Sequence, residues 1–250
     1  MAEKIQFRIR RQDTPYSPAY WQTFQVPFRE GLNVVSALMV IRQNPVTADG
    51  SKVDPVAWEF NCMEEVCGAC TMLINHRPMQ ACSTLVSSLE QPITLEPLSK
   101  FPVIRDLMVD RSRLFADLKR VRAWIEIDGA WDIHQGAPRI SPETWQINYL
   151  YSRCMSCGSC LEACPQYGQQ LAFVGPAALA AVRLMNNHPT GKYQRKQRLH
   201  AIMGEGGLSD CGNAQNCVQV CPKEIPLTTA IGELGRQTTK QLLKDLLGSG

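Results

Sequence analysis

The sequence has little histidine, no long hydrophobic run and no excess of charge of one sign. No stretch approaches the roughly 18–20 apolar residues that span a bilayer. The start, MAEKIQFRIRRQD, has neither the apolar core of a secretory signal nor the composition of a transit peptide. A net charge of +3, without a long basic run, excludes a nucleic-acid surface. We therefore expect a soluble protein, or one held at a membrane only by partner chains.

Motifs of nucleotide-dependent chemistry are also missing. GEGGLSDCGN lacks the last glycine of a dinucleotide fingerprint and follows no predicted strand, and there is no P-loop. The four histidines, at 76, 134, 188 and 200, are far apart in the sequence and lack metal-ligand spacing. Each is interpreted as structural or exposed, because no pairing of a base with a nucleophile is visible. The sequence thus predicts no catalytic residue.

Cysteine, in contrast, is abundant, with 11 residues that fall into clusters. An odd number argues against a complete set of disulfides within one chain. Without an export signal a reducing compartment is expected, and there clustered cysteines favour metal binding over disulfides.

Residues 1–104 have the pattern of a small α+β domain. The alternation of Ile5, Phe7 and Ile9 has the period of a half-buried strand. Val34, Leu38 and Ile41 have helical spacing. We expect strands at 4–13 and 21–28, a helix at 32–45, a hairpin at 70–83 bending at NHRP, and a strand at 92–98.

Residues 105–250 are predicted to be helical. Helices are expected at 105–125, 175–188 and 192–203, and in a tail that starts at Pro226. The first has Leu107, Leu114, Leu118 and Val121 on one apolar stripe. The tail has a mostly helical spacing of Leu227, Ile231, Leu234, Leu242 and Leu246. In the first of these, Asp106, Asp110 and Asp117 alternate with basic residues, a pattern typical of a solvated helix face.

The first cysteine group is CMEEVCGAC, which provides Cys62, Cys67 and Cys70, with Cys82 on the returning arm of the hairpin. The spacing C-x4-C-x2-C followed by a distant cysteine is the plant-type pattern for a [2Fe-2S] cluster. Gly68 suits a close approach of the backbone to such a cluster. A zinc site is the alternative, but structural zinc usually pairs two similar C-x2–4-C knuckles.

The second group, CMSCGSCLEACP, provides Cys154, Cys157, Cys160 and Cys164 and matches the bacterial ferredoxin run completely. The third group, CGNAQNCVQVCP, provides Cys211, Cys217 and Cys221. In two-cluster ferredoxins the fourth cysteine of each run binds the cluster of the other run. Cys221 is then expected to complete a [4Fe-4S] site with Cys154, Cys157 and Cys160.

Ala214 stands where the third group should have its second cysteine. Only Cys164, Cys211 and Cys217 remain for the second cluster, so the iron without a thiolate is expected to be lost, leaving [3Fe-4S]. This assignment uses every cysteine in the sequence. Decay of the motif, or a fourth iron ligated by water or hydroxide, are the alternatives.

These motifs together resemble the iron–sulfur subunit of succinate dehydrogenase and fumarate reductase. CMEEVCGACTMLINHRPMQAC, FPVIRDLMVDRSRLF, NHPTG and CGNAQNCVQVCPKEIPLTTAI carry the resemblance over nearly the whole chain. It implies an N-terminal plant-type ferredoxin (β-grasp) domain followed by an all-α two-cluster ferredoxin-like domain. It also implies that Cys62, Cys67, Cys70 and Cys82 lie near the flavin and that Cys164, Cys211 and Cys217 lie near the quinone.

The resemblance further implies a function: non-catalytic electron transfer within a succinate:quinone oxidoreductase of the tricarboxylic acid cycle. The expected partners are a FAD-bearing succinate dehydrogenase subunit and a membrane-anchor subunit with haem b and menaquinone, at the cytoplasmic face of the cell membrane. Fumarate reductase, the same path run in reverse, and a free-standing soluble electron carrier are the alternatives.

Two positions depart from ubiquinone-using members that resemble this chain. Those carry histidine directly after the first cysteine of the last run, and tryptophan a few residues past the CP of the first run. This sequence has Gly212 and Gln169 in those places. This departure indicates an iron–sulfur subunit of the bacterial enzymes that use menaquinone.

Overall fold

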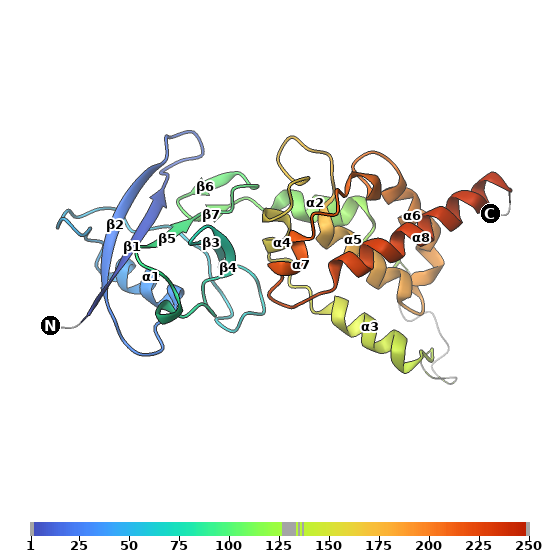
Figure 1. The fold of residues 1–250 in the computed structure, drawn as a ribbon, viewed down its shortest axis with the longest axis horizontal. Helices are drawn as coiled ribbons and strands as arrows, with labels where there is room; N and C mark the ends of the chain where they lie inside the picture. The colour runs from blue at the N-terminus through green and yellow to red at the C-terminus, as the bar shows by residue number, and fades with distance from the viewer. Residues whose placement is uncertain (1–2, 127–133, 135, 137, 249–250) are drawn as a thin grey trace. The chain divides into compact units, whose positions relative to one another are not determined.

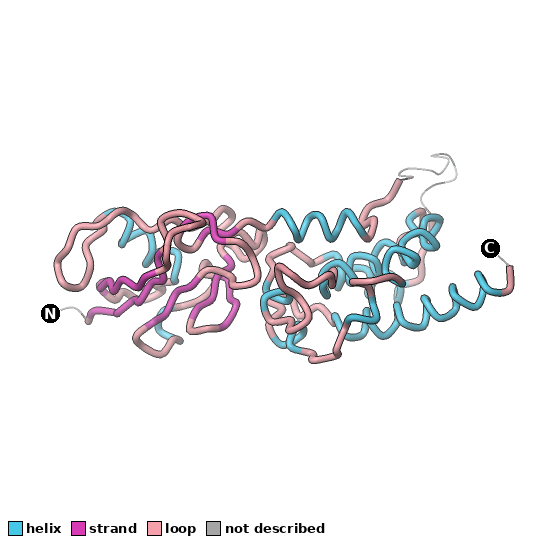
Figure 2. Tube along the Cα trace, turned by 90° about the horizontal axis from the view of Figure 1, so that it is seen from above, coloured by secondary structure: helices cyan, strands magenta, loops and turns pink. Residues whose placement is uncertain are grey.

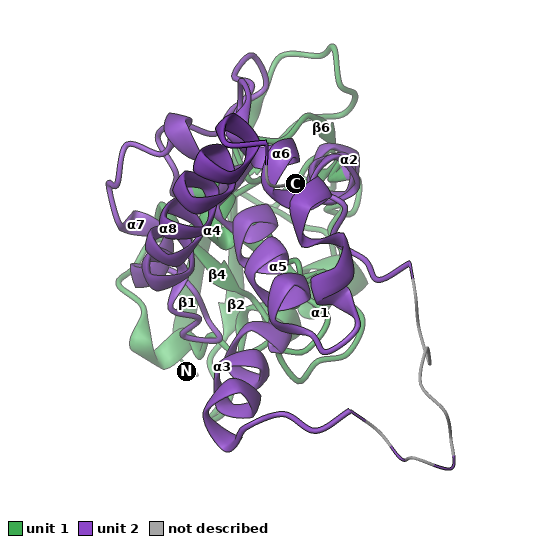
Figure 3. Ribbon diagram, turned by 90° about the vertical axis from the view of Figure 1, so that its right-hand side faces the viewer, with its two compact units in different colours: residues 1–111, 155–162 green, residues 112–154, 163–250 purple. Residues whose placement is uncertain are grey.

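The computed structural model describes residues 3–126, 134, 136 and 138–248 (Figure 1). It divides into two compact units (Figure 3). Unit 1 comprises Met1–Arg111 and Met155–Glu162, and unit 2 comprises Ser112–Cys154 and Ala163–Gly250. The sequence did not indicate that a short segment from the second cysteine group belongs with the first unit.

Unit 1 is built on a five-stranded sheet with the order β2-β1-β5-β3-β4. Its strands are β1 (Lys4–Arg11), β2 (Tyr20–Pro27), β3 (Thr71–Ile74), β4 (Arg77–Gln80) and β5 (Ile93–Glu96). β1 pairs antiparallel with β2 and parallel with β5, and β3 pairs antiparallel with both β4 and β5. The predicted strands and hairpin are confirmed.

Alternation along the strands places one set of side chains in the core. Ile5, Phe7 and Ile9 of β1 and Phe24 and Val26 of β2 are all buried. The predicted helix is α1 (Val34–Gln43), which lies beside the sheet (Figure 1). Its apolar stripe packs into the same core as the sheet. The period of 2 in the strands and of about 3.6 in the helix therefore identified the buried faces correctly.

The hairpin turn between β3 and β4 is formed by Asn75 and His76, both with positive φ. The turn therefore has two central residues, fewer than the four residues NHRP at which the sequence predicted the bend. Positive φ at both central residues is characteristic of a two-residue type I′ hairpin loop. Cys82 lies two residues beyond β4 rather than on the strand itself.

A second, two-stranded sheet, β6 (Val103–Arg105) and β7 (Met108–Val109), replaces the start of the helix predicted at 105–125. Leu107 lies in its turn and joins the core of unit 1. Asp106 is 0% exposed and accepts hydrogen bonds from Arg11 Nε at 2.8 Å and from the Ala57 amide at 2.8 Å. The prediction of a solvated face was wrong here, because sequence alternation does not show a long-range partner such as Arg11.

Met155–Glu162 contains α4 (Ser159–Glu162) and is held to unit 1 by polar contacts. The carboxylate of Glu162 accepts hydrogen bonds from the hydroxyl of Ser99 and from the amide of Lys100. Gln80 Nε2 donates to Ser159 Oγ at 3.4 Å. These bonds explain why the segment belongs to the first unit.

In the described part of the chain every strand belongs to unit 1, and unit 2 is helical (Figure 2). Its helices are α2 (Ser112–Arg120), α3 (Pro142–Ser152), α5 (Gly175–Asn187), α6 (Arg195–Met203), α7 (Asn216–Gln219) and α8 (Leu227–Leu246), with the 3-10 turns η3 (Gly191–Gln194) and η4 (Leu208–Asp210). α5 is buried along most of its length and contacts α2, α3, α6 and α8. An N-terminal sheet domain followed by a helical domain is the predicted fold class.

Several details of unit 2 differ from expectation. α3 was not predicted, because its side chains are largely exposed and show almost no apolar periodicity. Asp117 of α2 is buried beside Tyr167, whose hydroxyl donates to it at 3.0 Å. Leu227 and Leu234 of α8 are buried as expected, whereas Leu242 and Leu246 are exposed. No helix among the described residues is long and apolar enough to cross a membrane.

Candidate iron–sulfur sites

The loop around Cys62 directs backbone donors at its sulfur. The amides of Glu64, Val66 and Cys67 donate to Cys62 Sγ at 3.4, 3.3 and 3.3 Å. Positive φ values at Met63 and Glu65 curl the backbone so that its N–H groups point inward. These bonds lower the pKa of Cys62 to about 6, because hydrogen bonds to a thiolate favour its charged form.

The pKa of Cys70 is shifted in the opposite direction. Burial raises the pKa of Cys70 to about 12, since a buried thiol resists ionisation. Its thiol is hydrogen-bonded to Cys82, and Cys67 also acts on it electrostatically. Cys67 in turn is hydrogen-bonded to Cys62. The structure therefore brings all four predicted cysteines together, as the pairs Cys62–Cys67 and Cys70–Cys82.

This arrangement fits a two-iron cluster, in which each of two irons takes two protein thiolates. The polarised amides around Cys62 match the need of a charged cluster for hydrogen bonds to sulfur. Within the described residues, no three His, Cys, Asp or Glu side chains are placed to hold a single metal ion.

Gly68 has a φ of +70°, which a residue with a side chain rarely adopts. A Cβ at this position would lie 2.7 Å from the Cβ of Cys157 and 2.8 Å from its Cα. The backbone at Gly68 therefore lies close to Cys157, a member of the second cysteine group. Both residues belong to unit 1.

Cysteines of the second and third groups are divided between the units. Cys157 and Cys160 belong to unit 1, whereas Cys154 and Cys221 belong to unit 2. Cys157 is buried and its thiol contacts Ser159 Oγ at 3.4 Å. Cys221 Sγ accepts a hydrogen bond from the amide of Ile225 at 3.4 Å.

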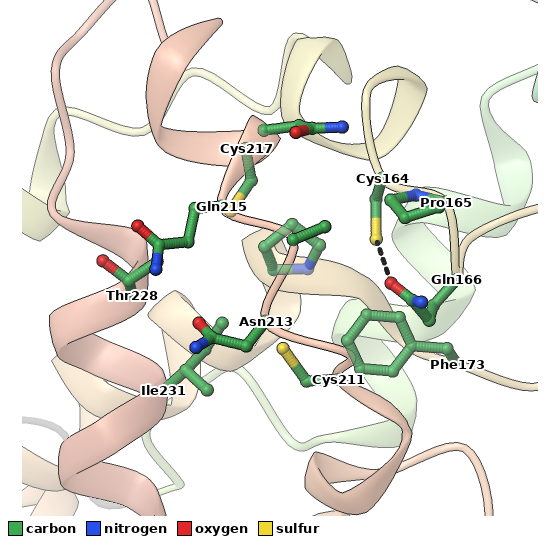
Figure 4. A pocket seen from close by; sticks show the side chains of 13 residues that line it. Cys164, Pro165, Gln166, Phe173, Cys211, Asn213, Gln215, Cys217, Thr228 and Ile231 are labelled. Atoms are coloured by element: carbon green, nitrogen blue, oxygen red, sulfur yellow. Dashed lines mark hydrogen bonds between the residues drawn. The ribbon is translucent and has the colours of Figure 1, made fainter.

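In unit 2 a pocket is lined by Cys164, Cys211 and Cys217 (Figure 4). Ala214 also lines this pocket. Burial is the main factor that raises the pKa of Cys217, and negative charge on Cys164 and Cys211 adds to it. The three thiols are therefore close enough to influence one another, as ligands of one cluster must be. The structure places the three cysteines that the sequence predicted for this site around one pocket, and Ala214 lines the same pocket.

The loop that carries Ala214 wraps the pocket tightly. Its neighbours Asn213 and Gln215 have φ values of 52° and 62°, in the left-handed region. The side chain of Asn216 donates to the Ala163 carbonyl at 3.1 Å and so joins this loop to the residue preceding Cys164. The conformation places residues from both cysteine groups around one space.

Gln166 is a residue of this site that sequence reasoning missed. A Cβ at Gly212 would lie 2.5 Å from Gln166 Nε2, so the amide occupies the space beside the glycine. The thiol of Cys164 contacts Gln166 Oε1 at 3.9 Å. The absence of a side chain at Gly212 was visible in the sequence, but the residue that fills the space was not.

Arg111 was missed as well. Its guanidinium donates to the Gly68 carbonyl at 2.8 Å, to the Ala69 carbonyl at 2.9 Å and to the Thr71 carbonyl at 3.5 Å. No spacing rule connects it to the first cysteine group. Only the tertiary structure brings it to the loop.

Comparisons with known proteins identify the family of the chain. The sequence matches the 2Fe-2S iron-sulfur cluster binding domain family over residues 6–116 and the 4Fe-4S dicluster domain family over residues 150–225. It is 55% identical to the succinate dehydrogenase iron-sulfur subunit of Bacillus subtilis, over 98% of this chain and 96% of that protein. It is 31% identical to the fumarate reductase iron-sulfur subunit of Wolinella succinogenes, over 95% of this chain and 98% of that protein.

A solved structure, the Sdh1 complex of Mycobacterium smegmatis in the apo form, contains a chain of similar fold. The TM-score is 0.79 at 22% identity, covering 96% of this chain and 98% of that chain. At this identity the likeness concerns the fold alone.

Proposed function

Because the chain belongs to the family of succinate dehydrogenase iron–sulfur subunits, we propose that it carries electrons one at a time from the FAD of a flavoprotein subunit to quinone at a membrane anchor. The observation that carries this proposal is the 55% identity over nearly the whole length of both chains. The fumarate reductase subunits are more distant, at 31% and below. This difference favours succinate oxidation as the direction.

Three sites are proposed along the chain. Cys62, Cys67, Cys70 and Cys82 hold [2Fe-2S]. Cys154, Cys157, Cys160 and Cys221 hold [4Fe-4S]. Cys164, Cys211 and Cys217 hold [3Fe-4S]. When bound, each cluster supplies a centre that accepts and releases one electron without breaking a bond in the protein.

The chain's own residues supply ligands, hydrogen bonds and exclusion of water. In the two-iron site the amides of Glu64, Val66 and Cys67 stabilise negative charge on Cys62. Burial of Cys70 and Cys82 shields the other side of that site from solvent. In the three-iron site the nonpolar side chain of Ala214 leaves one corner without a protein ligand. Ligand number, net charge and hydrogen bonds to sulfur set a cluster's potential, so these differences separate the potentials of the sites.

The proposed partners are a FAD-bearing subunit and a membrane anchor with haem b, with the chain held peripherally on the cytoplasmic face. Support comes from unit 2, which exposes large apolar side chains on α3 and at the end of α8. They are Trp145, Ile147, Tyr149, Leu150, Leu242, Leu243, Leu246 and Leu247. Groups of exposed large apolar side chains on two helices fit an interaction surface and argue against a free-standing carrier.

Menaquinone is the proposed electron acceptor. The support is the pair Gly212 and Gln166, since a neutral amide lies beside the three-iron site where resembling ubiquinone enzymes have histidine. An amide does not change its charge in the physiological pH range, whereas an imidazole does.

The cluster assignment is tested by metal analysis and EPR of the purified complex. We expect about nine irons per copy of this chain, from the sum of two-, four- and three-iron clusters. The oxidised sample should give a three-iron signal without added reductant, and a two-iron signal should appear on reduction. Zinc in place of iron, or about ten irons without a three-iron signal, contradicts the assignment.

Ala214→Cys tests the vacant corner directly. Position 214 has the ferredoxin spacing to Cys211 and Cys217, so the added thiolate is expected to convert the three-iron site to [4Fe-4S]. The three-iron EPR signal should disappear and quinone reduction should slow, while succinate oxidation with an artificial acceptor at the flavin persists. Ala214→Ser, which adds a hydroxyl group instead of a thiolate, is the matched control. A normal three-iron signal in an assembled Ala214→Cys complex contradicts the assignment.

A further inference from the structure

Arg111 is a partly buried cation next to the first cysteine group. Its three hydrogen bonds, to the carbonyls of Gly68, Ala69 and Thr71, all go to the backbone that follows Cys67. Its Nε is buried without a hydrogen-bond partner among the described residues. The guanidinium is thus held against the loop, with its planar fork matched to successive carbonyls.

Within the part of the chain that the structure describes, the bonds of the Arg111 guanidinium go to carbonyl groups and not to a carboxylate. Arg11, which is buried in unit 1, shows the contrast, because its guanidinium forms two hydrogen bonds with Asp106. Burial lowers the pKa of Arg111, while Glu59, Cys157, Cys70 and Cys67 act in the opposite direction through their negative charge. Buried charges are normally paired. Three of the four groups that favour the charged form of Arg111 are cysteines of the proposed clusters.

Arg111 also lies where two cysteine groups meet. Gly68, whose carbonyl it binds, is the residue that packs on Cys157. The same guanidinium therefore contacts the two-iron loop and acts on a proposed four-iron ligand. All of these residues belong to unit 1.

We propose that Arg111 is a positioning residue that raises the reduction potential of the two-iron site and holds the Gly68 loop against Cys157. Four thiolates outweigh the positive charge of a two-iron core, and reduction adds one further negative charge. A fixed cation at the loop stabilises the reduced form more than the oxidised form. Because arginine stays protonated, the effect requires no proton transfer. This inference rests on the cluster assignment of the proposed function.

The test is an EPR-monitored redox titration of the two-iron signal in the intact complex. Arg111→Gln keeps a donor for the carbonyls but removes the charge, and Arg111→Lys keeps the charge but removes the fork. We expect Arg111→Gln to lower the equilibrium constant for reduction about tenfold, or about 59 mV for one electron. Arg111→Lys should retain most of the wild-type potential.

The matched control is Arg10→Gln. Arg10 is an arginine of unit 1 on β1 whose side chain is 43% exposed and lies 3.7 Å from Glu96, and its removal changes the net charge equally. We expect it to leave the potential unchanged. The proposal is overturned if Arg111→Gln has the wild-type potential, if Arg111→Lys falls as far as Arg111→Gln, or if Arg10→Gln produces the same shift.

Arg111→His provides a second test of the proposal if the Arg111→Gln variant does not assemble the cluster. Histidine changes its charge between about pH 5 and 8, so the two-iron potential should fall more steeply with pH in this variant than in the wild type. Equal slopes overturn the proposal. A wild-type complex without a two-iron signal contradicts the cluster assignment instead, so the two failures are distinguishable.

Discussion

At the scale of single residues, the first cysteine group combines thiols of opposite acidity. Cys62 receives three backbone hydrogen bonds and its pKa is about 6, whereas buried Cys70 has a pKa of about 12. The loop therefore provides one ligand that is ionised at neutral pH before iron arrives. Cys70 ionises only when the positive charge of iron offsets the cost of burial.

Alkylation of the cluster-free chain should reveal this difference. With iron removed under reducing conditions, Cys62 should react first, because the thiolate is the nucleophile. Its rate should rise between about pH 5 and 7 and then level off, whereas an ordinary thiol continues to gain reactivity to about pH 9. Cys70 should stay unlabelled over this range. Peptide mass spectrometry measures both, and the same reaction in denaturant should remove the difference. Equal labelling in the folded chain contradicts the expectation.

Gly68→Ala tests the contact with Cys157. The new Cβ would meet Cys157 at 2.7 Å in a left-handed conformation. The backbone conformation alone costs about 1–2 kcal/mol, and the clash adds to it by separating the loop from Cys157. We expect a lower thermal midpoint together with slower electron transfer from the two-iron to the four-iron site.

Gly31→Ala is the matched control for this variant. Gly31 has a φ of +73°, but a Cβ added there would have nothing within 4 Å of it. We expect Gly31→Ala to lower stability only by the cost of the left-handed backbone conformation. Its rate of electron transfer, measured by rapid-freeze EPR, should be normal. Similar transfer rates in the two variants would mean that the contact at Gly68 has no role in electron transfer.

At the scale of elements, helix α1 is tied to the two-iron site by its first turn. Asn33 Oδ1 accepts a hydrogen bond from the amide of Ser36 at 2.8 Å and so caps the helix. Asn33 Nδ2 donates to the carbonyl of Cys82 at 3.0 Å. One side chain thus fixes both the start of the helix and the fourth ligand of the first group.

Two substitutions separate these roles. Asn33→Ala removes the cap and the bond to Cys82, and loss of such a cap costs about 1 kcal/mol. Asn33→Ser retains a capping hydroxyl but is too short to reach Cys82. We expect both variants to lose the two-iron cluster to a chelator faster than the wild type, while only Asn33→Ala has a clearly lower thermal midpoint. Unchanged cluster loss in both, followed by visible absorbance, contradicts the link between Asn33 and Cys82.

At the scale of the whole molecule, the role that we propose for the chain is electron transfer within a larger complex. Its proposed clusters account for all 11 cysteines. The exposed apolar residues of α3 and α8 include Trp145 at 56% and Leu246 at 74% exposure. Such side chains are costly to leave in water, which suits a subunit covered by partners.

The chain purified without partners should therefore be brown but should not oxidise succinate with any acceptor. Addition of the flavoprotein subunit should restore oxidation with an artificial acceptor, and addition of the anchor should then allow quinone reduction. The measurement is acceptor reduction after each addition. Succinate turnover by the flavin-free chain contradicts the proposed division of labour.

The sequence by itself determined the cysteine groups and most of the elements that carry them. Alternation at Ile5, Phe7 and Ile9 and the helical spacing of Val34, Leu38 and Ile41 identified the core of unit 1, because these patterns follow from local backbone geometry. The absence of a cysteine at position 214 was equally visible, since ferredoxin spacing is a property of a short loop.

Only the tertiary structure decided which distant residues surround those cysteines. Asp106 was assigned to solvent from its charged neighbours, yet it is buried because Arg11 lies opposite. Likewise, Arg111 reaches the loop at Gly68, and Gln166 fills the space at Gly212. The physical reason is the same in each case: a buried polar group needs a partner, and chain folding rather than sequence spacing brings that partner to it.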